Sequence, residues 1–206
     1  MRIENPGHIA NIGRHVPRVI PASEMDMRII VYGSRYGTTK KYAEELSRVT
    51  GVPALSYEKV KDINVYEEIY YFGALYAGGV MGMKKTFLRL LDADSKKIII
   101  TTVGLADPQD EENVCAIERS MEKQLTPEIY QKAKIFHLRG GIDYERLGVV
   151  HMTMMAMLYE KAKKLPEKKM TADAKALVET YKKQVNFVDF RGLWPIIDAC
   201  MHRSWQ

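Results

Sequence analysis

From residue 27 onward, apolar and polar positions follow two alternating periods. Short runs of β-branched and aromatic residues predict five strands, at 28–32, 54–57, 68–73, 97–103 and 134–139. Between these runs, apolar residues recur three and four positions apart, which is typical of helices with one buried face. The first such face comprises Tyr42, Ala43, Leu46 and Val49, and its helix is expected to end before Gly51.

Three later stretches repeat the helical spacing. Their expected inner faces are Met83, Phe87, Leu90 and Leu91; then Val114, Ile117, Met121 and Leu125; and finally Leu193, Ile196, Ile197, Cys200 and Met201. Residues 148–184 stand before the last helix and predict two helices broken near Leu165–Pro166. Alternating strands and helices predict an α/β fold, a doubly wound parallel sheet with helices on both faces.

The domain organisation follows from where this alternation begins. Residues 1–26 are rich in proline and glycine and show neither period, so we expect an irregular N-terminal extension that is not an export peptide. Met25 and Met27 precede the first strand, and we hypothesise that the functional start lies there. Residues 27–206 are expected to form one domain with an insertion at about 141–185, because this length suits a single core.

Composition narrows the function classes. Lysine and arginine number 31 against 26 acidic residues, a net charge of +5, which favours anionic partners. The charges are interspersed, so nucleic acid is not an expected partner. No apolar run approaches the roughly 20 residues of a membrane-spanning helix. Cys115 and Cys200 lack metal-ligand spacing and are expected to be reduced thiols of a cytoplasmic protein.

The first strand leads into a candidate anion site. The run Ile29–Val31 stops at Gly33, and the sequence Ser34-Arg-Tyr-Gly-Thr-Thr39 follows before a helix. Backbone N–H groups, hydroxyls and the positive end of a helix dipole gather there, which suits a phosphate. The loop has neither the Gly-x-Gly-x-x-Gly of Rossmann folds nor a P-loop Gly-Lys-Ser/Thr. An ordinary turn with a threonine N-cap is the structural alternative.

Two further loops are expected at the same edge of the sheet. In Ala74–Gly82, Tyr76 offers a flat aromatic neighbour, and small residues bring backbone amides to the edge of a planar ring. An aromatic exposed in a turn is the alternative for Tyr76. The stretch Val103–Ala106 offers main-chain groups to the same ring edge.

These motifs resemble those of the flavodoxin-like family. Ser34-Arg-Tyr-Gly-Thr-Thr39 resembles the Ser/Thr-x-x-Gly-x-Thr phosphate loop of flavodoxins, and Gly73-Ala-Leu-Tyr-Ala-Gly78 resembles the second flavin loop of their relatives. Over about residues 27–202 the layout is similar to the flavodoxin-type, menaquinone-dependent protoporphyrinogen oxidases, which share the basic character and the helical insertion before the last helix. Two departures are the basic charge, unlike that of acidic flavodoxins, and Tyr36, where many flavodoxins have a small hydroxyl residue.

The resemblance implies a flavodoxin-like sheet of order 2-1-3-4-5 and FMN as cofactor. It assigns phosphate contacts to Ser34, Arg35, Tyr36, Gly37, Thr38 and Thr39, and ring contacts to Leu75, Tyr76, Ala77 and Gly78. The third loop adds Val103, Gly104, Leu105 and Ala106.

The expected function is therefore an FMN-binding oxidoreductase in which the flavin carries the chemistry, with no catalytic side chain and no metal. A quinone or porphyrinogen is the implied redox partner. The alternatives are an electron carrier that docks on a redox partner protein and a flavin-free binding module of the same fold.

The insertion carries two further signals. Leu147–Leu158 contains His151 and four methionines, and five lysines follow, at Lys161, Lys163, Lys164, Lys168 and Lys169. A methionine-rich helix adapts to apolar ligands, and the lysines beside it suit a lipid surface. One interpretation is therefore peripheral contact with the inner membrane face through residues 147–169. A packed helix with a solvated basic end is the other. The oligomeric state is left open.

Overall fold

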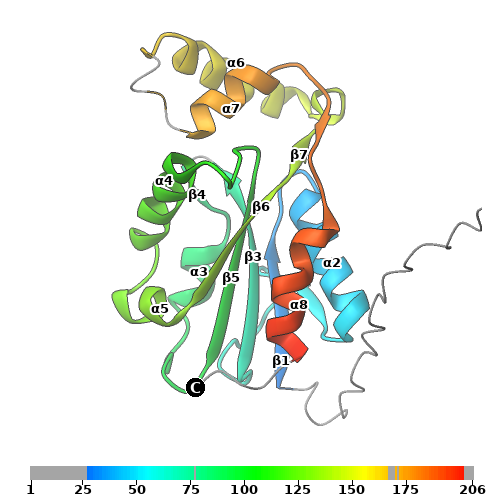
Figure 1. Cartoon of the computed structure of the whole chain (residues 1–206), viewed down its shortest axis with the longest axis vertical. Coiled ribbons are helices and arrows are strands. Elements are labelled where there is room, and N and C mark those ends of the chain that lie inside the picture. Colours follow the sequence, from blue (N-terminus) through cyan, green and yellow to red (C-terminus); the bar gives the residue numbers. More distant parts are fainter. Residues whose placement is uncertain (1–26, 77, 167–169, 171, 202–206) are drawn as a thin grey trace, which may run out of the picture.

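A five-stranded parallel sheet lies between two layers of helices in the computed structural model of the chain (Figure 1). The structure describes residues 27–76, 78–166, 170 and 172–201, so the predicted N-terminal extension and Ala77 lie outside it. The strands are β1 (Arg28–Gly33), β2 (Ala54–Ser56), β3 (Glu68–Tyr76), β5 (Lys97–Gly104) and β6 (Lys134–Arg139). Their order, β2-β1-β3-β5-β6, confirms the predicted order 2-1-3-4-5.

The alternation within β1 shows why both faces of the sheet are covered. Ile29 and Val31 pack toward α3 (Met83–Phe87), α4 (Glu111–Glu122) and α5 (Pro127–Lys132), whereas Ile30 packs toward α2 (Thr38–Thr50) and α8 (Trp194–Met201). All three side chains are fully buried. A strand buried on both faces reads as a continuous apolar run, as this one does.

The segment after β3 differs from the sequence prediction. β3 continues to Tyr76 and pairs antiparallel with β4 (Gly79–Val80), so Ala74–Gly82 is a hairpin and not a loop. The following helix, α3, ends at Phe87, and Leu91, expected on its inner face, is 88% exposed. The Leu91 N–H donates to Asn64 Oδ1 (2.9 Å), which holds this segment outside the helix.

A stretch that the sequence predicted as one helix forms two helices in the structure. The helix expected to include Leu125 ends as α4 at Glu122, and α5 starts at Pro127 after Thr126, whose hydroxyl accepts the Ile129 N–H. Apolar spacing alone does not reveal this break, because Leu125 is still buried in the turn. The cap and the proline mark the second helix.

The insertion forms a layer above the carboxyl ends of the strands (Figure 1). It contains the two predicted helices, α6 (Val149–Lys163) and α7 (Ala172–Thr180). One 3₁₀ turn, Tyr144–Arg146, precedes α6, and another, Phe190–Leu193, precedes α8. The short strands β7 (Gly141–Ile142) and β8 (Val185–Asn186) pair antiparallel, so the two ends of the insertion lie side by side. Among the described helices, none has the length and apolarity to cross a bilayer.

Candidate functional site

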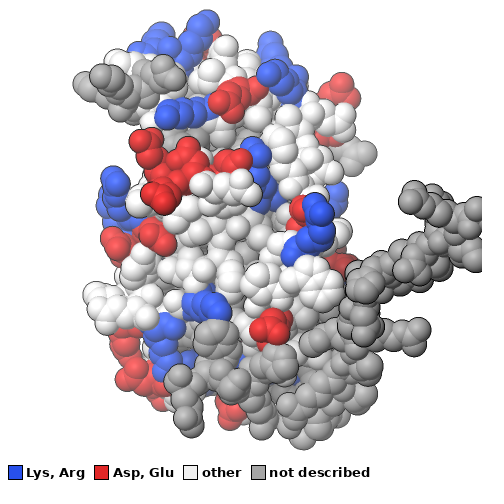
Figure 2. Space-filling model, in the orientation of Figure 1, with Lys and Arg blue, Asp and Glu red and all other residues white. Residues whose placement is uncertain are grey.

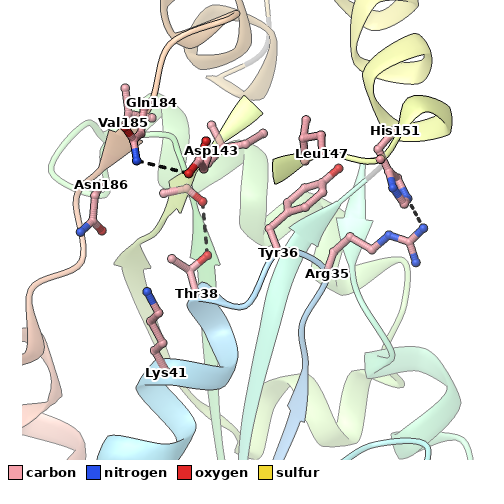
Figure 3. A pocket seen from close by; sticks show the side chains of 13 residues that line it. Arg35, Tyr36, Thr38, Lys41, Asp143, Leu147, His151, Gln184, Val185 and Asn186 are labelled. Atoms are coloured by element: carbon pink, nitrogen blue, oxygen red, sulfur yellow. Dashed lines mark hydrogen bonds between the residues drawn. The ribbon is translucent and has the colours of Figure 1, made fainter. Parts of the chain in front are cut away.

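Two adjoining cavities lie at the carboxyl ends of the strands, beneath the insertion. The first, here called the apolar chamber, has a volume of about 470 Å³. The loop after β1, the start of α2, the ends of β3 and β5 and the segment after β6 bound it below, and α6 and α7 bound it above. The second, the polar chamber, has a volume of about 430 Å³ and lies between the start of α2 and the β7–β8 pair (Figure 3). Both chambers share Tyr36, Thr38, Gly141 and Ile142 as walls.

Apolar side chains form most of the wall of the apolar chamber. The sheet edge contributes Leu75, Tyr76, Val103 and Leu105, and the insertion contributes Met154, Met155, Leu158, Leu165 and Leu177. Lys161 and the hydroxyls of Thr38 and Thr39 are among its polar groups. A mostly apolar cavity of this size with a few polar groups is the usual form of a cofactor or small-molecule site.

The polar chamber brings two cationic side chains and a helix N-terminus together, with the carboxylate of Asp143 also in its wall. Arg35 and Lys41 line it, and the first turn of α2 begins there (Figure 3). The N-cap of this 13-residue helix is Gly37, which provides no side-chain cap, and the first turn contains no acidic residue. The backbone N–H groups of that turn are thus left without the side-chain acceptor that capped helices have. With the helix dipole, they suit a phosphate.

The loop before α2 is shaped by its glycine. Gly37 has φ 89° and therefore lies in the left-handed region, where a side chain causes strain. Ser34 Oγ accepts a hydrogen bond from the Gly37 N–H (3.2 Å), which closes the loop into a tight turn. The alternative of a turn capped by threonine is wrong, because Gly37 occupies the N-cap position.

Tyr36 lies in the wall that the two chambers share, and its hydroxyl is a hydrogen-bond donor without an acceptor among the described residues. Its ring contacts Tyr76 edge-on, at a centroid distance of 6.4 Å, and His151 at 6.0 Å. Burial raises the pKa of Tyr36, so the hydroxyl stays protonated at neutral pH. This hydroxyl is buried, and no described residue accepts its hydrogen bond. A buried polar atom without a partner is one that a ligand can satisfy.

Direct contacts join the site loops to α6. The Tyr76 hydroxyl contacts Met154 Sδ at 3.2 Å, and Arg35 is hydrogen-bonded to His151 (Figure 3). The Arg35 guanidinium also lies 5.8 Å from the centre of the Tyr76 ring. Residues that line the two chambers therefore also hold the insertion in place above them.

Two sets of hydrogen bonds hold the ring loops in place. Arg139 donates from Nε and Nη2 to the Leu105 carbonyl (3.3 and 3.1 Å) and pairs with Asp107 (3.4 Å). The Ser120 hydroxyl donates to the Gly78 carbonyl (2.6 Å), and Gln124 accepts the Val80 N–H (3.2 Å). The loops that line the apolar chamber are thus fixed from β6 and α4.

Comparison with known proteins supplies the family. A family model described as a flavodoxin domain matches residues 29–169, more than half of the chain. The chain belongs to this flavodoxin family. No curated protein matches it significantly.

Solved structures similar to the chain include two of proteins called putative flavoproteins. The one from Bacteroides uniformis ATCC 8492 has 14% identity and a TM-score of 0.41, and the match covers 55% of this chain and 90% of that one. The one from Bacteroides eggerthii DSM 20697 has 12% identity and a TM-score of 0.38, with 53% and 84% covered.

The flavodoxin domain brings most of the fourteen predicted site residues together. Nine line the apolar chamber: Tyr36, Thr38, Thr39, Leu75, Tyr76, Gly78, Val103, Gly104 and Leu105. Arg35 lines the polar chamber. Ser34 and Gly37 shape the loop without lining either chamber, and Ala106 is buried against Ala176. Ala77 lies outside the described residues. Whether these residues bind FMN stays a prediction.

Several lining residues were not predicted. Lys41, Gly140, Gly141, Ile142, Gln184 and Asn186 come from the start of α2 and from the two ends of the insertion. The glycine pair that ends the fifth strand was a usable signal, because this strand end meets the same sheet edge as the other loops. Among the described residues, no group of three or more His, Cys, Asp or Glu side chains is placed to hold a metal ion.

Proposed function

We propose that this flavodoxin domain binds FMN and acts as an oxidoreductase. The observation that carries the proposal is the junction of an apolar chamber with an anion site, with the unpaired Tyr36 hydroxyl between them. FMN has the same sequence of parts: a flat ring, a polar chain and a phosphate. When bound, the flavin supplies the redox chemistry.

In this proposal, residues of the chain bind and orient the FMN and shield its ring from water. The first turn of α2, Arg35 and Lys41 would hold the phosphate. Leu75, Tyr76 and Leu105 would hold the ring, and the protonated Tyr36 hydroxyl would donate a hydrogen bond to a polar group between ring and phosphate. Met154 and Met155 of α6 would exclude water from the ring.

For the redox partner we propose a small apolar molecule of the quinone or porphyrinogen class. The support is the apolar wall that the insertion adds, including Leu158, Leu165 and Leu177. A flexible methionine-rich wall accommodates ligands of irregular shape. An enzyme that acts on such a small molecule needs no second protein, whereas an electron carrier docks on a partner protein.

Titration of FMN into the purified protein tests the cofactor. We expect saturable uptake of one FMN per chain, with a change in the fluorescence of the flavin. Protein that is colourless as purified and takes up no added FMN would contradict the proposal. Oxidation or reduction of a soluble quinone by the FMN-loaded protein, without a second protein, tests the partner class, and turnover that requires a protein partner would favour the carrier.

A further inference from the structure

α6 exposes several apolar side chains on its outer face, beside the polar Thr153 and Glu160, and buries others on its inner face. Toward the sheet, Met155 and Ala162 are buried. On the outer side, Val149 is 76% exposed, Val150 is 78% exposed and Met157 is 58% exposed. A surface helix of a globular protein normally turns its polar residues outward. This outer face, here called the α6 ridge, is therefore unusual in presenting apolar side chains to solvent.

The α6 ridge continues into a basic region. Lys161, Lys163 and Lys164 are exposed at the carboxyl end of the helix. Over the whole insertion, residues 141–185, the sequence contains nine basic against six acidic residues, a net charge of +3. Figure 2 shows basic side chains, together with some acidic ones, at the end of the molecule that the insertion forms. Among the described residues, these three lysines follow the apolar side chains of the ridge along the same helix.

We propose that the α6 ridge docks on an anionic lipid surface. Val149, Val150 and Met157 would enter the boundary between headgroups and acyl chains, and the lysines would contact lipid phosphates. Exposed apolar side chains supply area that can be buried in a membrane interface, and lysines near them are attracted to anionic headgroups. The charge decides for lipid over an apolar protein groove, because a groove needs no concentration of lysines. This docking does not require a bound flavin.

The α6 ridge lies on the same helix as one wall of the apolar chamber. The inner face of the same helix forms the wall of the apolar chamber through Met154, Met155 and Leu158. A protein docked by its ridge therefore holds this chamber one helix away from the lipid.

Vesicle flotation with the full-length protein tests the inference. We expect binding to phosphatidylcholine vesicles that contain phosphatidylglycerol, weak binding to phosphatidylcholine alone, and release as the salt concentration rises. Val150→Asp combined with Met157→Asp should weaken binding to the anionic vesicles at least about tenfold. The matched control is Val65→Asp with Leu88→Asp, since these side chains are similarly exposed, at 55% and 65%, but lie outside the insertion.

The lysines are tested separately. Lys161→Gln, Lys163→Gln and Lys164→Gln together should reduce the preference for anionic vesicles, whereas Lys59→Gln, Lys84→Gln and Lys85→Gln should leave it intact. Circular dichroism verifies that each variant is folded. The inference is overturned if the wild type binds no vesicles or if both aspartate pairs bind equally. It is also overturned if the ridge variant loses a self-association or a protein complex while vesicle binding is unchanged.

Discussion

Lys41 and its neighbour Lys40 provide a matched pair for locating the phosphate. Lys41 lines the polar chamber, whereas Lys40 is exposed and pairs with Glu44 at 3.4 Å. We expect Lys41→Ala to weaken FMN binding at least about tenfold, because a hydrogen bond to a charged group contributes roughly 1.5–3 kcal/mol. Lys40→Ala should bind like the wild type. Equal losses in the two variants, measured by flavin fluorescence, would place the phosphate elsewhere.

His137 makes stability depend on pH. Burial lowers the pKa of this histidine, the charge of Glu118 offsets this only in part, and Thr102 Oγ1 is hydrogen-bonded to its Nδ1 (2.7 Å). The unfolded chain takes up a proton near the ordinary pKa of 6.5, while the folded protein does so only at lower pH. The stability linked to this neutral histidine is therefore complete above that pKa and is lost as the pH falls toward the folded value.

We accordingly expect the free energy of unfolding to decrease between about pH 7.5 and about pH 5.5. Urea unfolding at the two pH values measures it. In His137→Gln the decrease should be smaller, because the ring that titrates is gone. An identical decrease in the variant would assign the effect to other groups.

Among the elements, β6 supports the site through one side chain. Arg139 joins it to the loop after β5 by bonds to the Leu105 carbonyl and Asp107, and its guanidinium lies 3.8 Å from the centre of the Phe187 ring. We expect Arg139→Leu to lower the free energy of unfolding by roughly 1.5–3 kcal/mol and to weaken FMN binding, since Leu105 lines the apolar chamber. Arg119→Leu, an exposed site on α4, is the control. Unchanged stability and affinity would exclude this supporting role.

On the scale of the whole molecule, the insertion is separable from the core. Its ends pair in register, Gly141 opposite Asn186. Of the insertion residues that the structure describes, none is buried in the two cores that flank the sheet. Replacing residues 143–184 by Asn-Gly would close β7 and β8 as a hairpin. We expect the shortened chain to fold, as measured by circular dichroism and cooperative unfolding.

The same shortened chain should bind FMN more weakly than the full chain, because the apolar chamber loses the wall formed by α6 and α7. A chain that does not fold would show that the insertion belongs to the core. A chain that folds and binds FMN with full affinity would remove the insertion from the site.

Local patterns in the sequence were enough to predict the five strands of the parallel sheet and most of the helices. Ile29–Val31 reads as a buried strand, and the break near Leu165–Pro166 separates α6 from α7. These features depend on side-chain periods and on the conformations of glycine and proline, which are properties of residues near one another in the chain.

The way the site closes depends on contacts that form only in the folded chain. Thr38 donates from Oγ1 to the Gly141 carbonyl (3.3 Å), 103 residues away, and this contact lies in the wall between the two chambers. The hairpin at Tyr76, the hold of Arg139 on Leu105 and the inward turn of Ala106 are decided in the same way. Each depends on contacts between segments far apart in the chain, and side-chain periods do not specify such contacts.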